Sequence, residues 1–154
     1  TVTNADGLSI NGTGGDDTIA TAGSSGGLPR PTDDNDTPFG LGGNDTLDGG
    51  TGNDKLEGGN GKDVFETAGR SDRRVGGAGN DCVVLNETDV AGHFDGGAGT
   101  GDSIDASPLP SLSLSIDLGA GTYTDRGQTF DLLSVEHATG GQGNDRITGS
   151  SAGN

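Results

Sequence analysis

The chain has 154 residues, of which 27% are hydrophobic and 3% aromatic, so an ordinary globular core would be thin. Its 8 basic and 24 acidic residues give a formal charge of −16 at pH 7, which argues against nucleic acid or an anionic membrane as a partner and favours cations. No apolar run approaches the ~18 residues of a membrane span, and the single cysteine, Cys82, excludes an intrachain disulfide.

A nonapeptide of the form Gly-Gly-x-Gly-x-Asp-x-apolar-x recurs along the chain, and an early copy covers residues 12–20. Residues 21–38 hold three of the five prolines and predict a loop-like interruption. A degenerate copy at residues 31–39 keeps Asp36 at place six. We therefore interpret residues 1–39 as degenerate N-terminal repeats with a proline-rich break.

Residues 40–84 contain five consecutive nonapeptides in one register, which predicts a regular repeat domain. The copy at residues 67–75 has lost most of its glycines but keeps Asp72 at place six. Residues 85–104 are predicted to be degenerate repeats, with one extra residue before Asp102.

The C-terminal part follows a different pattern. In residues 105–139, apolar and polar side chains alternate over residues 111–118, and a second apolar stretch covers residues 130–135. This period of two predicts a β segment with longer strands. Residues 140–154 hold a final copy with Asp145 at place six and then a truncated one, so we expect the chain to be part of a longer protein.

Each place of the repeat has its own physical role. Glycines in the first half permit positive φ, so the backbone curls tightly and turns carbonyl oxygens inward. Place five holds Asp or Asn, as at Asn44 and Asn53, which tolerate the left-handed conformation of a tight turn. Place eight is apolar and is predicted to point into the core, at Ile19, Leu47, Leu56, Phe65, Val83 and Ile147.

Two nonapeptides that face opposite ways close one coil of a flattened solenoid. The predicted fold is therefore all-β, a parallel β-roll (β-solenoid) with a less regular β segment near the C-terminus. Place-six aspartates 18 residues apart would stack about 4.8 Å apart, where two carboxylates repel by roughly 1 kcal/mol even in water. One predicted row contains Asp45, Asp63 and Asp81, and the other contains Asp36, Asp54 and Asp72.

The expected cofactor is Ca²⁺, in several copies, because carboxylate and carbonyl oxygens are the ligands that calcium prefers. Zinc would require His or Cys, and magnesium tends to keep its waters.

At these residues the chain resembles the RTX, or hemolysin-type calcium-binding, repeat family, whose repeats form parallel β-rolls and are exported by type I secretion. The resemblance implies an ion between stacked loops, bound by carbonyls of places two and four and by Asp six of one loop. The loop two units further on adds carbonyls of places one and three and its own Asp six. The implied metal ligands are Leu41, Gly43 and Asp45 with Gly58, Asn60 and Asp63; Gly59, Gly61 and Asp63 with Gly76, Ala78 and Asp81; and Gly50, Gly52 and Asp54 with Thr67, Gly69 and Asp72.

Further candidate metal ligands lie at place six of less regular copies, at Asp17, Asp36, Asp102 and Asp145. For the third implied set an alternative stays open, in which a nearby arginine replaces the cation: Arg70, Arg73 or Arg74.

Other site types do not fit. An EF-hand beginning at Asp33 would need glycine at Pro38 and glutamate at Asn44. Gly61-Lys62 is followed by Asp63 and not by Ser or Thr, so a P-loop is absent, as are metalloprotease and nucleophile-elbow motifs. We expect no catalytic residue and no enzyme activity in this chain.

The expected function is an extracellular calcium-binding module that folds on binding Ca²⁺. It would be a structural or adhesive segment of a larger secreted or cell-surface protein, with copies of itself or other cell-surface proteins as partners. An alternative is the calcium-dependent C-terminal tail of a secreted enzyme or toxin whose catalytic domain lies outside this chain.

Overall fold

The computed structural model describes residues 9–12, 14–15, 18–20, 35–50, 52–66, 71–86, 91–110 and 113–150. Their strands are β1 (Ser9–Asn11), β2 (Thr18–Ala20), β3 (Thr37–Gly42), β4 (Thr46–Asp48), β5 (Lys55–Asn60), β6 (Val64–Glu66), β7 (Ser71–Ala78), β8 (Cys82–Val84), β9 (Ala91–Ala98), β10 (Ser103–Asp105), β11 (Ser115–Asp117), β12 (Thr122–Asp125), β13 (Gln128–Leu133), β14 (His137–Thr139) and β15 (Arg146–Thr148). Among these residues no helix is long and apolar enough to cross a membrane.

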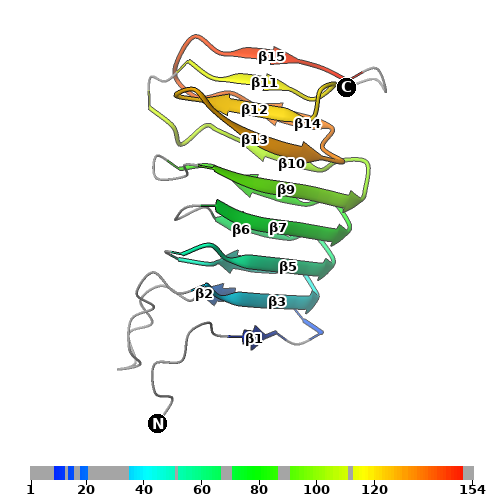
Figure 1. The fold of residues 1–154 in the computed structure, drawn as a ribbon. Helices are drawn as coiled ribbons and strands as arrows, with labels where there is room; N and C mark the ends of the chain where they lie inside the picture. The colour runs from blue at the N-terminus through cyan, green and yellow to red at the C-terminus, as the bar shows by residue number, and fades with distance from the viewer. Residues whose placement is uncertain are drawn as a thin grey trace.

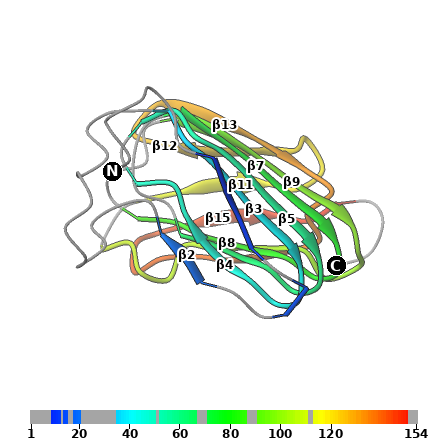
Figure 2. The same ribbon diagram turned by 90° about the horizontal axis from the view of Figure 1, so that it is seen from below.

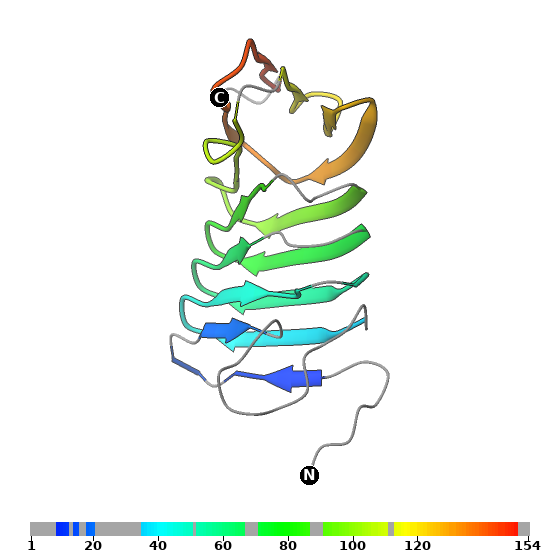
Figure 3. The same ribbon diagram turned by 90° about the vertical axis from the view of Figure 1, so that its left-hand side faces the viewer.

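The strands form two sheets that face each other across the interior (Figure 2). The long sheet has the order β1-β3-β5-β7-β9-β13-β12-β11-β15, and the short sheet has the order β14-β10-β8-β6-β4-β2. The chain runs along a strand of the long sheet, turns into the short sheet and turns back one level higher (Figures 1 and 3).

Neighbouring coils are in parallel register. Leu47 of β4 pairs with Phe65 of β6, and Phe65 pairs with Val83 of β8. Each regular coil therefore contains 18 residues, or two nonapeptides, as the hydrogen bonds between coils also show. The predicted all-β parallel roll is confirmed.

The core consists largely of place-eight side chains. Four predicted core residues are at most 1% exposed: Leu47, Leu56, Phe65 and Val83. Burying each such side chain stabilises the fold by roughly 1.5–3 kcal/mol. The prediction is wrong for Ile147, which is 45% exposed because β15 is the terminal strand of the long sheet. The side chain of Ile19 lies outside the described part.

Some coils are longer than the regular 18 residues. Ile19 of β2 pairs with Leu47 of β4, a separation of 28 residues (47 minus 19), so the proline-rich break lengthens this coil. Val83 of β8 pairs with Ile104 of β10, a separation of 21 residues (104 minus 83). The strand register is therefore kept across the interruptions seen in the sequence.

Above β10 an antiparallel segment interrupts the roll. β13 continues the long sheet in parallel beside β9, and β14 continues the short sheet beside β10. Strand β12, however, pairs antiparallel with both β11 and β13, between which it lies (Figure 1). These three strands contain three to six residues, so the segment at residues 105–139 is β-structured but its strands are not longer than the eight-residue β7 and β9.

Candidate metal centre

Two rows of buried aspartates follow the two edges of the roll. We call the turns that lead from the long sheet into the short sheet the first edge, and the turns that lead back the second edge. The first row lies on the first edge and contains Asp45, Asp63, Asp81 and Asp102; the second row lies on the second edge and contains Asp36, Asp54 and Asp72. Each of these side chains is at most 3% exposed. They point inward because places six and eight share one face of the strand.

In Asp63, Asp81 and Asp102, one carboxylate oxygen is bound by the coil before it. The backbone N–H of Asp45 donates to Oδ1 of Asp63 at 2.9 Å, and the N–H of Asp63 donates to Oδ1 of Asp81 at 2.8 Å. The N–H of Asp81 donates in the same way to Oδ1 of Asp102 at 2.7 Å. The carboxylates are therefore structural parts of the turn ladder, and their positions are fixed.

The other oxygen lies against the glycine at place one of the same repeat. A Cβ built on Gly58 would overlap Oδ2 of Asp63 and would lie 2.8 Å from the carbonyl oxygen of Gly76 in the next coil. Glycine at place one of a regular repeat therefore leaves room for a carboxylate oxygen and a carbonyl oxygen to converge there.

Several of these second oxygens have no protein partner. Within the described residues, Oδ2 is buried without a hydrogen bond in Asp54, Asp63, Asp81 and Asp102. Burying an ionised oxygen without a partner costs several kcal/mol. A cation beside these oxygens would remove that cost.

The pKa values of the buried aspartates also favour a cation beside the two rows. Burial, with the neighbouring aspartates, raises the pKa of Asp54 to about 7 and the pKa of Asp81 to about 6, although the backbone hydrogen bond opposes the shift. Burial also raises the pKa of Asp63, Asp72 and Asp102. A positive charge beside these carboxylates would favour their ionised form.

The glycines at places two and four bring the carbonyls close to the next coil. Gly59 and Gly61 have φ of 116° and 131°, which a side chain disfavours. The carbonyl oxygens of Leu41 and Gly43 in the preceding coil occupy the space that a Cβ at Gly59 or Gly61 would fill. The predicted carbonyl ligands of places two and four therefore face the loop with which they would share an ion.

The carbonyls of place three are arranged differently. The N–H of Gly43 donates to the carbonyl of Asn60 at 2.9 Å, and the N–H of Gly61 donates to the carbonyl of Ala78 at 2.7 Å. These two predicted ligands thus already take part in the hydrogen bonds that join the coils.

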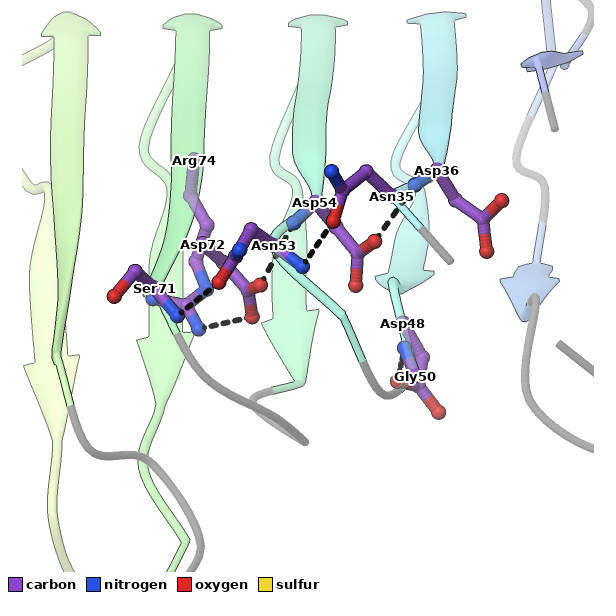
Figure 4. A network of polar contacts seen from close by, with 9 residues as sticks. All are labelled: Asn35, Asp36, Asp48, Gly50, Asn53, Asp54, Ser71, Asp72 and Arg74. Atoms are coloured by element: carbon purple, nitrogen blue, oxygen red, sulfur yellow. Dashed lines mark hydrogen bonds and ion pairs between the residues drawn. The ribbon is translucent and has the colours of Figure 1, made fainter. Parts of the chain in front are cut away.

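The second edge has the same ladder (Figure 4). The N–H of Asp36 donates to Oδ1 of Asp54 at 2.7 Å, and the N–H of Asp54 donates to Oδ1 of Asp72 at 2.9 Å. Gly50 and Gly52 lie in the turn before Asp54 with φ of 77° and 147°.

Place five has a role that the sequence did not reveal. The side-chain Oδ1 of Asn53 accepts from the N–H of Ser71 at 3.1 Å, and Oδ1 of Asn44 accepts from the N–H of Lys62 at 2.8 Å. Neither asparagine is among the described residues with positive φ, so the predicted left-handed conformation is wrong. On the second edge the N–H of Asn53 donates in turn to Oδ1 of Asn35, so these side chains form a second ladder beside the carboxylates (Figure 4).

The C-terminal part extends both edges. Oδ1 of Asp145, on the second edge, accepts from the N–H of Leu114 at 3.0 Å. On the first edge, Glu136 takes the position above Asp102, and its Oε2 accepts from the N–H of Asp102 at 3.0 Å. The sequence analysis missed Glu136 because only three residues, Ser134 to Glu136, form this turn, so the nonapeptide spacing is lost.

Three predicted ligands, Asp17, Thr67 and Gly69, lie outside the described residues. In the described part of the chain, no group of three or more His, Cys, Asp or Glu side chains forms a metal cluster. The arrangement instead offers a few carboxylates among many backbone carbonyls, which suits calcium with its six to eight oxygen ligands.

The comparison with protein families agrees with this geometry. The model of the RTX calcium-binding nonapeptide repeat matches the chain in four copies, over residues 32–65, 39–81 and 136–152. No curated protein and no solved structure matches the chain. Such repeats bind several Ca²⁺ ions per array. The nonapeptides at residues 32–81 and 136–152 are therefore RTX calcium-binding repeats.

Proposed function

We propose that this chain is an extracellular module that folds when it binds calcium and remains unfolded without it. The observation that carries the proposal is the buried, partnerless Oδ2 of Asp54, Asp63, Asp81 and Asp102. A chain with 27% hydrophobic residues and a charge of −16 has little other stabilisation to offset this cost.

The residues that would hold the ions come from stacked turns. On the first edge these are the carboxylates of the first row with the carbonyls of Leu41, Gly43, Gly58, Gly59, Gly61 and Gly76, and Glu136 extends the row by one coil. On the second edge Asp54 would act with Gly50 and Gly52, and Asp145 lies in the last turn. Bound calcium supplies positive charge and accepts oxygen lone pairs.

Linkage makes the binding a folding switch. Calcium that binds only the folded state stabilises that state, and ions shared between neighbouring coils make folding cooperative. Where calcium is scarce, as in the cytosol, the chain would stay extended and competent for export through a type I secretion channel.

The proposed setting is a larger secreted or cell-surface protein in which this module is structural or adhesive. RTX repeats typically occur in secreted proteins. In the described part of the chain, β1 and β15 end the long sheet, and β2 and β14 end the short sheet. Edge strands can pair with further chains, so copies of itself are candidate partners.

The test is a calcium titration followed by far-ultraviolet circular dichroism, with magnesium at equal concentration as the control. Calcium should produce a cooperative β signal, and magnesium should not. An equal β signal without calcium would overturn the proposal. Mass spectrometry of the intact parent protein addresses the setting, since an upstream catalytic domain would instead favour the tail of a secreted enzyme or toxin.

A further inference from the structure

The second row contains an arginine where the repeat requires an apolar residue. In the column of inward side chains on the long sheet, Leu56 pairs with Arg74, and Arg74 pairs with Phe94. Arg74 therefore stands at place eight, two residues after Asp72 and on the same strand face. Its side chain is only 2% exposed, so its charge lies inside the roll.

The guanidinium of Arg74 binds Oδ2 of Asp72. The equivalent oxygen in the neighbouring coil, Oδ2 of Asp54, has no hydrogen bond from the described part of the protein. Nη2 of Arg74 donates to Oδ2 of Asp72 at 2.8 Å, and both side chains are 2% exposed (Figure 4). Oδ1 of Asp72 accepts from the N–H of Asp54, as the regular ladder requires. In Asp72, therefore, a protein cation binds the oxygen whose counterpart in Asp54 is buried without a hydrogen bond to the residues described.

The next coil is adapted to this side chain. Asp72 pairs with Gly92, at the point where a regular repeat would have its place-six aspartate. A Cβ at Gly92 would lie 2.9 Å from Nη1 of Arg74 and 3.3 Å from the carbonyl oxygen of Asp72. Position 92 of the coil above thus has no carboxylate, and its glycine leaves space for the guanidinium.

We propose that Arg74 replaces calcium between the coil of Asp72 and the coil of Gly92, as an internal cation that ends the second row of ion sites. The inference rests on the proposed function of the other aspartates. Arginine keeps its charge at any physiological pH and calcium concentration, and its planar group forms directional bonds to a carboxylate. The second edge is therefore held at this level without calcium, while the first row continues to Asp102 and Glu136.

The test compares three variants of the full chain with the wild type. Arg74→Leu removes the cation but supplies the apolar residue that place eight normally has, so lost packing does not explain its effect. Arg73→Leu, on the exposed face of the same strand, is the matched control. Arg74→Leu/Gly92→Asp restores the apolar residue at place eight of one coil and the aspartate at place six of the next.

Native mass spectrometry at saturating calcium counts the bound ions, and circular dichroism gives the calcium concentration at the folding midpoint. Arg73→Leu should match the wild type in both. Arg74→Leu should need a severalfold higher calcium concentration, because Asp72 is left buried without its partner. The double variant should bind one ion more than the wild type and recover much of the lost midpoint.

Two results would overturn the inference. One is an Arg74→Leu variant with the midpoint and ion number of the wild type, since the guanidinium would then compensate no charge. The other is a double variant that folds and binds no additional ion. A wild-type chain that binds no calcium would instead refute the proposed function, so the two failures are distinguishable.

Discussion

Replacing Asp63 with asparagine should change stability in opposite directions with and without calcium. Asp63 lies in the middle of the first row, and it belongs to two of the implied sites. At a calcium concentration 100 times the dissociation constant, one site contributes about 2.7 kcal/mol. Weakening two sites should therefore lower the free energy of unfolding in calcium by about 3–5 kcal/mol.

Without calcium the same substitution should stabilise the folded form. The asparagine Oδ1 can still accept from the N–H of Asp45. The amide group that replaces Oδ2 can donate to the nearby carbonyl of Gly76, which removes a buried partnerless oxygen. The expected gain is roughly 1–3 kcal/mol.

Urea unfolding of the wild type and of Asp63→Asn measures both effects. It is done in saturating calcium and again in a chelator with an osmolyte that favours the compact state. Glu66→Gln, an exposed carboxylate on β6, is the control and should change neither value by more than about 0.5 kcal/mol. A change of the same sign in both conditions would refute the charge argument.

Three further predictions concern pH and single residues. Between about pH 8 and pH 5 the calcium-free folded form should become more stable as the pH falls. The raised pKa values of Asp54 and Asp81 make the folded form bind more protons than the unfolded chain in this range. This contribution to stability is lost as the pH rises through about 6 to 7. In calcium titrations by circular dichroism the effect reverses, since protons compete with the ion and the midpoint should rise at low pH; a pH-independent midpoint would contradict this. Leu41→Gly should raise the melting temperature in calcium, because Leu41 has φ of 77° and is 51% exposed at a place where later coils have glycine. Relieving the backbone strain at this residue is worth about 1 kcal/mol. A lower melting temperature would contradict the conclusion that the backbone of Leu41 is strained. Glu136→Gln can keep the hydrogen bond from the N–H of Asp102 but loses the charge, so native mass spectrometry should find one calcium ion fewer, whereas an unchanged number would show that Glu136 only closes the turn.

The period of the sequence predicted most of the regular roll. Nine residues with glycine, aspartate and an apolar residue at fixed places specify a turn and a short strand, so the stacking of Leu47, Phe65 and Val83 followed directly. The two rows of aspartates followed from the same register, because two repeats complete one coil. The carboxylate–backbone ladder itself was not foreseen, since it depends on which of two oxygens faces the preceding coil.

Features that break the period could not be read from it. Glu136 reaches its position through a turn of only three residues, and Leu114 meets Asp145 across an antiparallel segment, so sequence distance gives no guide to either contact. The exposure of Ile147 depends on its place in the terminal strand, which the repeat pattern does not encode. Which of three neighbouring arginines could replace a cation stayed open in the sequence; the strand face distinguishes buried Arg74 from exposed Arg73, and Arg70 lies outside the described residues.

Small-angle scattering of one sample before and after chelation tests the central claim most directly. With calcium, the radius of gyration should be close to the roughly 15 Å of a compact chain of this length, somewhat increased by the elongated roll. After chelation it should rise toward the roughly 40 Å of an unfolded chain and return when calcium is restored. A radius that stays at the compact value in the chelator would contradict the claim that cations hold the two rows of carboxylates together.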